Sequence, residues 1–196
     1  KSINVCVLIS GTGSNMLSLL DKLKKEPLIN FPLIISNNPL SPGLQKAQKL
    51  GYNCKVLIDD KHNDNSNKYE RKLHNLLVEE DIKVICLAGF MKIISPWMIR
   101  KWKGRIINIH PSLLPKYKGL NTHNRALKAK EKIHGCTVHY VTESLDDGEV
   151  IDNAIVKIEP NETKETLRKK VLIEEHRLYP EVLRRLVFNH NQFFSS

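Results

Sequence analysis

The first half of the chain alternates between short, nearly continuous apolar runs and segments in which apolar residues recur at helical spacing. Residues 3–9 form the first apolar run, a turn at 10–14 interrupts it, and residues 16–23 then follow a helical pattern. Continuous apolar runs are typical of strands buried on both faces of a parallel sheet. The alternation continues, with strands expected at 32–35, 54–58, 82–88 and 105–109, and helices at 43–50, at 69–80 and from Ser95-Pro96 onward.

The pattern changes after His110, where a loop runs to Gly119. The elements expected beyond it are a helix at 122–132, antiparallel strands at 136–141 and 150–158, and a long helix from 163 to about 189. This order predicts an α/β fold with a doubly wound, mostly parallel sheet, antiparallel C-terminal strands and a long C-terminal helix. Ligands of such sheets bind at the carboxyl ends of the strands.

We expect a single domain over residues 1–196, because no linker or internal repeat divides the chain. Within it, residues 1–110 are expected to form a phosphate-binding half, and residues 111–196 to complete the site. The polar stretch 59–67 is the best candidate for a mobile loop. The helix predicted at 69–80 would bury a stripe made of Leu73, Leu76, Leu77 and Val78.

Composition narrows the class of protein. No apolar run is long enough to cross a membrane, and the chain begins directly with a strand pattern rather than a signal peptide, so we expect it in the cytoplasm. The net charge is +10, but lysines occur in every segment and no basic run is interleaved with aromatic residues. We therefore interpret the charge as a general attraction for anionic substrates and expect no nucleic-acid groove.

The cysteines lack the close pairing of zinc ligands, so we expect free buried thiols and no metal at Cys6, Cys54, Cys86 and Cys136.

A glycine-rich turn, Gly11–Asn15, lies between the first strand and the first helix. Glycines let the backbone approach a ligand closely, the first N–H groups of a helix bind anions, and Ser14 and Asn15 add side-chain donors. The same residues also suit a tight turn with Ser or Asn as the helix cap. Met16 replaces the third glycine of a dinucleotide motif, Ser36-Asn37 replaces its acidic residue, and no Gly-Lys-Ser/Thr is present. A phosphate monoester fits this turn better than NAD or ATP.

A second motif, Asn108-Ile109-His110-Pro111, ends the fifth predicted strand. Side chains alternate along a strand, so Asn108 and His110 project to one face while Ile107 and Ile109 project to the other. An amide donor and a titratable imidazole thus meet at the carboxyl end of a parallel strand, where such sheets hold their reacting groups. A lone histidine at a strand end is more often structural, but the pair favours an active site.

Taken together, these motifs resemble the glycinamide ribonucleotide formyltransferases in sequence and in order. The matching segments extend from Ile3 to beyond Pro180, and the Asn-x-His-Pro-Ser-Leu-Leu-Pro block is specific to folate-dependent formyl transfer. The segments that carry the resemblance most clearly are 10–15, 87–91, 108–117 and 175–180. The resemblance implies transfer of the formyl group of 10-formyltetrahydrofolate to the glycyl amine of 5-phosphoribosylglycinamide, in de novo purine (IMP) biosynthesis. It also implies a Rossmann-like formyltransferase fold, present as a monomer or a homodimer.

The resemblance assigns roles to individual residues as well. It implies catalysis by Asn108, His110 and Asp146. It implies contacts with the ribonucleotide by Gly13, Ser14, Asn15 and Glu175. It implies contacts with the folate by Met91, Lys92, Ile93, Ile94, Asn108, Val141 and Thr142. His139 falls at a family histidine near the site, although by pattern alone it suits equally a packed strand residue.

The chain departs from the family pattern at several positions. Lys92 stands where an arginine often meets the folate tail, which keeps the charge but loses bidentate geometry. Ser66 corresponds to a folate-side arginine of some members, and Leu172 replaces a polar residue near the phosphate. Residues 145–149 carry extra acidic groups where relatives usually have Gly or Ala and then Pro. Asp146 is selected as the catalytic aspartate because it keeps the Leu-Asp spacing of the family.

These roles give a mechanism. When an amine attacks a formyl carbon, negative charge develops on the formyl oxygen, and Asn108 together with a protonated His110 would donate hydrogen bonds to it. A carboxylate at Asp146 would favour the imidazolium, so replacing it should lower turnover and move the pH profile downward. His110 would then pass the proton of the amine to the departing folate nitrogen.

Three other functions share parts of this pattern. Methionyl-tRNA formyltransferases contain the Asn-x-His core but add a C-terminal tRNA-binding domain, and formyltetrahydrofolate hydrolases normally add an N-terminal regulatory domain. We expect neither extra domain here. A non-enzymatic nucleotide- or RNA-binding module would leave the set of Asn108, His110 and Asp146 unexplained.

Overall fold

The computed structural model describes residues 2–58 and 66–189. Residues 59–65 of the predicted mobile loop lie outside this part of the chain, whereas residues 66 and 67 belong to helix α3 (Ser66–Glu79). The sequence of strands and helices follows the predicted order.

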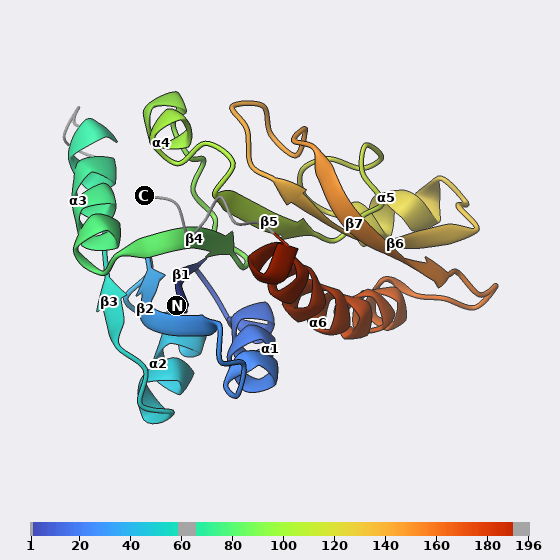
Figure 1. Cartoon of the computed structure of the whole chain (residues 1–196). Coiled ribbons are helices and arrows are strands. Elements are labelled where there is room, and N and C mark those ends of the chain that lie inside the picture. The colour runs from blue at the N-terminus through green and yellow to red at the C-terminus, as the bar shows by residue number, and fades with distance from the viewer. Residues whose placement is uncertain (1, 59–65, 190–196) are drawn as a thin grey trace.

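Within the described ranges, the strands form one seven-stranded sheet in the order β3-β2-β1-β4-β5-β6-β7 (Figure 1). The strands are β1 (Ile3–Ile9), β2 (Ile29–Ser36), β3 (Cys54–Val56), β4 (Ile82–Leu87), β5 (Ile106–His110), β6 (Ile133–Tyr140) and β7 (Val150–Lys157). The first five strands pair in parallel, while β6 runs antiparallel to β5 and β7 antiparallel to β6. The predicted fold class is therefore confirmed.

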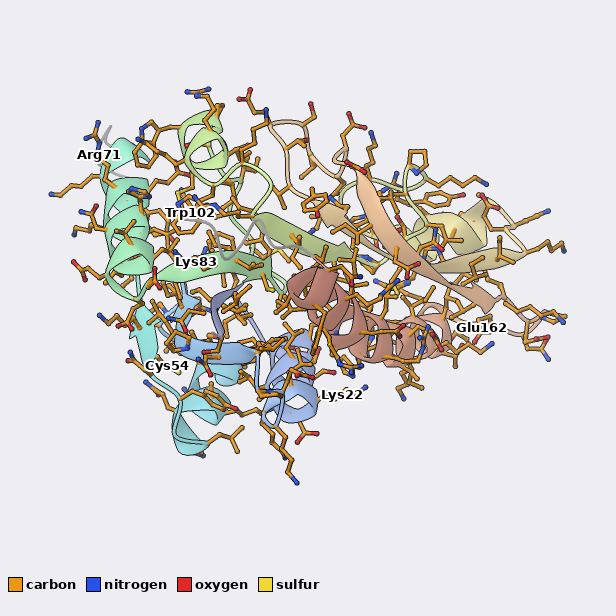
Figure 2. The ribbon with its side chains drawn as sticks, in the orientation of Figure 1. Lys22, Cys54, Arg71, Lys83, Trp102 and Glu162 are labelled. Carbon is orange, nitrogen blue, oxygen red and sulfur yellow. The ribbon has the colours of Figure 1, made fainter. Side chains whose placement is uncertain are left out.

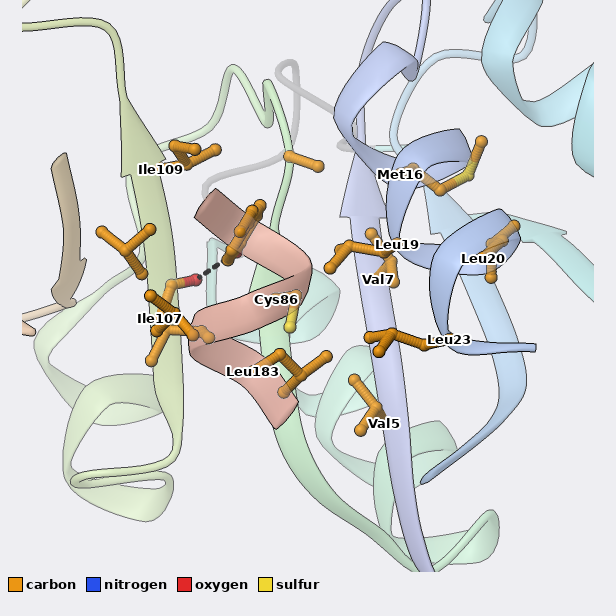
Figure 3. Close-up of a cluster of buried hydrophobic side chains, with 14 of the residues drawn as sticks. Val5, Val7, Met16, Leu19, Leu20, Leu23, Cys86, Ile107, Ile109 and Leu183 are labelled. Carbon is orange, nitrogen blue, oxygen red and sulfur yellow. Dashed lines mark hydrogen bonds between the residues drawn. The ribbon is translucent and has the colours of Figure 1, made fainter. Parts of the chain in front are cut away.

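Helices cover both faces of the sheet (Figure 1), which explains why β1 and β4 are apolar and buried along almost their whole length. The remaining helices are α1 (Ser14–Leu23), α2 (Pro42–Lys49), α4 (Pro96–Lys101), α5 (Thr122–Lys128) and α6 (Lys164–Asn189). Val5 and Val7 of β1 pack with α1 and α6 on one face, whereas Cys6 and Leu8 pack with α3 on the other. Figure 3 shows Val5 and Val7 against Leu19 and Leu23 of α1, with Leu183 of α6 alongside.

Helix α6 joins distant parts of the sheet. Its buried face contains Leu167, Val171, Leu178, Val182, Leu183 and Leu186, as the apolar spacing predicted. The Tyr179 hydroxyl of this helix lies within hydrogen-bonding distance of the carbonyls of Leu87, at 2.8 Å, and Ile107, at 3.2 Å. Leu87 is the last residue of β4 and Ile107 directly precedes Asn108 in β5, so one side chain of α6 contacts two paired strands beside the Asn108 motif.

Some sequence predictions were wrong in detail. Val78 was placed in the buried stripe of α3, but its side chain is 57% exposed, whereas Leu73 and Leu77 are fully buried. Leu73 and Leu77 are four residues apart and share one helix face, while Val78 lies about 100° further round. Helix α5 ends at Lys128 rather than at residue 132, because Lys130 adopts left-handed backbone (φ 55°).

The cysteines are free, as predicted, and three of the four are buried. Cys6, Cys86 and Cys136 are free and buried, and Cys54 is free and half-buried. Burial raises the pKa of the Cys86 and Cys136 thiols to about 12.

Basic side chains such as Lys22 on α1 and Arg71 on α3 project from separate elements (Figure 2). None of the helices in the described ranges combines the length and the apolar character that a membrane crossing requires.

Candidate active site

The Gly11–Asn15 turn is held tightly against α2. The Gly11 carbonyl accepts hydrogen bonds from the Gly43 amide at 3.0 Å and from the Ser41 hydroxyl at 2.7 Å. Gly13 caps α1 with left-handed backbone (φ 66°), and a Cβ there would lie 3.0 Å from the Cα of Gly43. This position therefore requires glycine for both reasons. The first N–H groups of α1 have no partner within the helix, and the first helical turn contains no acidic side chain that could accept from them.

Asn15 connects this turn to α6. Its Nδ2 donates a hydrogen bond of 3.1 Å to Oε1 of Glu175, a residue that is 7% exposed. Burial raises the pKa of the Glu175 carboxyl to about 7, although the hydrogen bond from Asn15 acts in the opposite direction. Oδ1 of Asn15 is buried and has no hydrogen-bond partner among the described residues. An unsatisfied buried acceptor is costly, and a ligand that donates a hydrogen bond there would remove the cost.

Pairing of β5 with β6 places Asn108 directly opposite His139. Nδ2 of Asn108 lies 3.3 Å from Nε2 of His139, and Nδ1 of His139 lies 2.9 Å from the carbonyl of Tyr140. These partners assign the His139 proton to Nδ1, so that Nε2 accepts from the amide. Burial lowers the pKa of His139, which favours this neutral form. His139 is thus both a packed strand residue and a neighbour of Asn108.

His110 and Asp146 form the second contact pair. Nδ1 of His110 lies 3.5 Å from Oδ2 of Asp146, and each side chain is only 8% exposed. Nε2 of His110 donates to the carbonyl of Tyr117 at 2.9 Å. Asp146 adopts left-handed backbone (φ 50°) and also faces His139, with Oδ1 3.9 Å from Nε2. The adjacent Asp147 turns away and contacts the ammonium group of Lys118. Asp146 is therefore the aspartate that faces the imidazole.

A cleft of about 720 Å³ connects these groups. Of the residues predicted for catalysis and folate contact, all line it: Asn108, His110, Asp146, Met91, Lys92, Ile93, Ile94, Val141 and Thr142. Asn15 and Glu175 also line it, whereas Gly13 and Ser14 do not. Among the described residues, no group of three or more His, Cys, Asp or Glu could hold a metal ion.

The cleft contains residues that the sequence motifs did not indicate. These are Gly119, Leu120, Asn121, Thr122, His123 and Lys164. The only indication of residues 119–123 in the sequence was their position after His110, and Lys164 had no such indication. Burial lowers the pKa of His123, whose Nδ1 lies 3.1 Å from Nε2 of His134.

Comparison with known proteins gives the family. The formyl transferase family matches residues 3–183. The chain is also 38% identical to phosphoribosylglycinamide formyltransferase of Escherichia coli (strain K12) over 182 residues, covering 92% of this chain and 85% of that protein. This chain belongs to the formyl transferase family. Sequence and structure thus converge on the family that the motifs suggested.

Solved structures of family members share the fold closely. Phosphoribosylglycinamide formyltransferase from Coxiella burnetii, in complex with CHES, is 40% identical, with a TM-score of 0.91 over 96% of this chain and 88% of that one. The enzyme of that name from Brucella melitensis is 38% identical, with a TM-score of 0.91 over 97% of this chain and 98% of that one.

The family also includes much longer proteins. The trifunctional purine biosynthetic protein adenosine-3 of Bos taurus is 41% identical over 184 residues. Those residues are 93% of this chain, but only 18% of the bovine protein. The chain therefore corresponds to one part of that relative.

Proposed function

We propose that this protein transfers the formyl group of 10-formyltetrahydrofolate to the glycyl amine of 5-phosphoribosylglycinamide, a step in purine biosynthesis. The observation that carries the proposal is the contact of His110 with Asp146 beside Asn108, in a cleft that continues to Asn15 and Glu175. The predicted reacting groups and Asn15, the last residue of the phosphate-type turn, thus line one cavity. The names of the relatives support the same reaction.

The phosphate of the ribonucleotide would bind at the turn after β1, in the half formed by residues 1–110. Gly13, Ser14 and Asn15 supply the first N–H groups of α1, and helix N-termini attract anions. The unpartnered Oδ1 of Asn15 and the buried carboxyl of Glu175 lie next along the cleft. They suit the hydroxyl groups of a ribose, which both donate and accept hydrogen bonds.

The folate would occupy the apolar part of the cleft, which residues 111–196 complete. Met91 and Ile93 are large apolar side chains that are 70% and 78% exposed while lining a cavity. Apolar walls with few polar groups are typical of sites for planar, drug-sized ligands, and a volume of about 720 Å³ is in the usual range. The Lys92 ammonium lies 4.8 Å from the centre of the Tyr69 ring, which keeps a cation at this end of the cleft. The bound folate supplies the formyl carbon that the amine attacks.

Asn108 and His110 would stabilise the charge that develops on the formyl oxygen. One N–H of the Asn108 amide is directed to His139, which leaves the other N–H for the oxygen. In this structure both ring nitrogens of His110 are engaged, with Asp146 and with the Tyr117 carbonyl. The imidazole would exchange its contact with Tyr117 for the substrate, and hydrogen bonds of this kind often tighten only once a substrate is bound.

Proton transfer completes the proposed reaction. The attacking amine loses a proton and the departing folate nitrogen gains one, so a group that holds a proton reversibly is needed between them. His110 would fill this role, with Asp146 as the partner that orients its ring. We further propose that the protein acts on these small molecules in the cytoplasm as a monomer or a homodimer, without a nucleic-acid partner.

A formyl-transfer assay with three acceptors tests the proposal. Purified protein is given 10-formyltetrahydrofolate with 5-phosphoribosylglycinamide, with charged initiator tRNA, or with water alone. We expect formylated ribonucleotide and tetrahydrofolate in equal amounts. Transfer to tRNA alone would indicate a tRNA formyltransferase, and release of formate alone would indicate a hydrolase. RNA binding at moderate salt without any transfer would indicate a binding module.

A further inference from the structure

Residues 117–120, here called the strap, contact both members of the His110–Asp146 pair through main-chain atoms. The Tyr117 carbonyl accepts from Nε2 of His110 at 2.9 Å, and the Gly119 amide donates to Oδ2 of Asp146 at 2.8 Å. The two main-chain groups are only two residues apart. In this structure the strap therefore helps to fix where the imidazole and the carboxylate lie relative to each other.

The strap contains strained backbone, and its neighbour Asn121 is strained as well. Tyr117 has left-handed backbone (φ 56°), and so does Asn121 directly after the strap (φ 62°). Left-handed backbone at a non-glycine residue costs roughly 1–2 kcal/mol. A segment with such backbone keeps one conformation only where neighbouring groups hold it.

Arg125 of α5 supplies that support. Its Nη1 donates to the carbonyl of Lys118 at 2.6 Å and to the carbonyl of Leu120 at 3.1 Å, on either side of Gly119. Its guanidinium also lies over the Tyr117 ring, 5.3 Å from the ring centre. One side chain thus contacts three of the four strap residues.

Because a peptide group is planar, holding its carbonyl also fixes the direction of its N–H. The carbonyl of Lys118 and the N–H of Gly119 belong to one trans peptide group and point in opposite directions. When Arg125 holds this carbonyl, the Gly119 N–H is directed away from α5 and toward Asp146. The guanidinium therefore acts on the carboxylate through a single rigid peptide plane.

We propose that Arg125 is a positioning residue for the His110–Asp146 pair. It touches neither member of the pair, and it sets their geometry by fixing the strap. The inference rests on the proposed formyl transfer, because it assigns a role to Arg125 in that reaction. The strap makes a further contact between Lys118 and Asp147, whose side chains are 38% and 53% exposed.

Two variants separate the charged donor group of Arg125 from the bulk of its side chain. Arg125→Met keeps a long side chain and removes all donors. Arg125→Lys keeps a cationic nitrogen, and the structure shows that a single nitrogen contacts both carbonyls. The matched controls are Arg184→Met and Arg184→Lys, because Arg184 is also an exposed helical arginine and pairs with Glu26 instead.

Steady-state kinetics with both substrates gives the first readout. We expect Arg125→Met to lower kcat about tenfold to a hundredfold with less than about a threefold change in either KM, because misplacement of a reacting group affects the transition state more than binding. Arg125→Lys should recover a large part of the loss. The unfolding temperature should stay close to that of the wild type, because Arg125 is exposed.

The Gly119 amide resonance gives a second readout that does not depend on activity. The chain has 9 glycines, so a spectrum of protein labelled with ¹⁵N-glycine is simple. A hydrogen bond to a carboxylate moves an amide proton downfield, and we expect Arg125→Met to move the Gly119 proton upfield while Arg184→Met leaves it in place.

The outcomes separate the two proposals. Wild-type protein that transfers formyl to no acceptor would overturn the proposed function, while the Gly119 resonance would still report on the strap. An active wild type together with an Arg125→Met variant that keeps its kcat, or changes KM alone, would overturn the positioning role. An unchanged Gly119 resonance in that variant would do the same.

Discussion

Asn15 and Glu175 lie 160 positions apart in the chain and share a hydrogen bond of 3.1 Å between Nδ2 and Oε1. The bond connects the turn after β1 with α6, and therefore joins the first and the last of the sequence motifs. Because burial raises the pKa of Glu175 to about 7, its carboxyl is partly protonated at neutral pH. Near neutral pH the Glu175 carboxyl is therefore present both as a protonated form that can donate a hydrogen bond and as a carboxylate that only accepts.

Replacing Glu175 with Gln should change how stability depends on pH. The folded chain keeps a proton that the unfolded chain releases above about pH 4.5, so stability falls as the pH rises from 4.5 toward 7 and is constant above it. The loss is on the order of 3 kcal/mol, and Glu175→Gln should remove it because Gln does not ionise. Urea unfolding of the wild type and of Glu175→Gln at pH 5 and pH 8 measures how the stability of each protein depends on pH.

The matched control is Glu181→Gln, on the same helix but half exposed beside Arg177. This variant should retain the wild-type dependence of stability on pH. If Glu175→Gln and Glu181→Gln show parallel slopes, the raised pKa of Glu175 is wrong.

Replacing Gly13 with Ala should destabilise the turn for two reasons at once. Alanine would have to keep the left-handed backbone of this position, and its Cβ would lie 3.0 Å from the Cα of Gly43. We expect a loss of roughly 2–4 kcal/mol in the free energy of unfolding, the sum of backbone strain and overpacking. Gly51→Ala is the control, because Gly51 has φ 88° but open space around it, so only the strain of roughly 1 kcal/mol applies. Equal losses at the two glycines would contradict the tight packing against α2.

Replacing Asn108 with Ala should lower turnover without a matching loss of substrate binding. The variant removes the donor proposed for the formyl oxygen, and the loss of one such donor typically lowers kcat about a hundredfold to a thousandfold. It also leaves Nε2 of His139 without its partner. Asn30→Ala, at an exposed position on β2, serves as the control. A rise in KM with an unchanged kcat would assign Asn108 to binding instead.

Comparing Asp146→Asn with Asp147→Asn tests which aspartate takes part in the reaction. Asparagine at 146 can still accept from the Gly119 amide but lacks the charge beside His110, so kcat should fall about a hundredfold. Asp147 contacts an exposed lysine, and exposed ion pairs are weak, so kcat should fall only about threefold. Rates at saturating concentrations of both substrates decide the comparison, and the reverse order would show that the assignment is wrong.

Much of the fold followed from the apolar pattern. The buried face of α6 and the strand β1 were predicted almost residue by residue, because burial on both sides of a sheet and along one helix stripe leaves a clear periodicity. Val78 was misplaced because an apolar residue at the edge of a stripe looks the same in sequence as one at its centre.

The candidate site was predicted only in part. Strand alternation placed Asn108 and His110 on one face, and family spacing selected Asp146. The strap and Arg125 left no motif, because they act through main-chain carbonyl and amide groups that every residue carries. The link between Asn15 and Glu175 depends on tertiary packing of α1 with α6, which local sequence does not encode.

Helix α6 has a consequence for biosynthesis on the ribosome. Glu175 faces the turn after β1, and Tyr179, one helical turn later, contacts Leu87 of β4 and Ile107 of β5. Chains that emerge N-terminus first can pair β1 to β5 early, yet the cleft lacks Lys164 and Glu175 until α6 has been translated. A nascent chain should therefore acquire a nearly complete sheet well before it acquires affinity for its ligands.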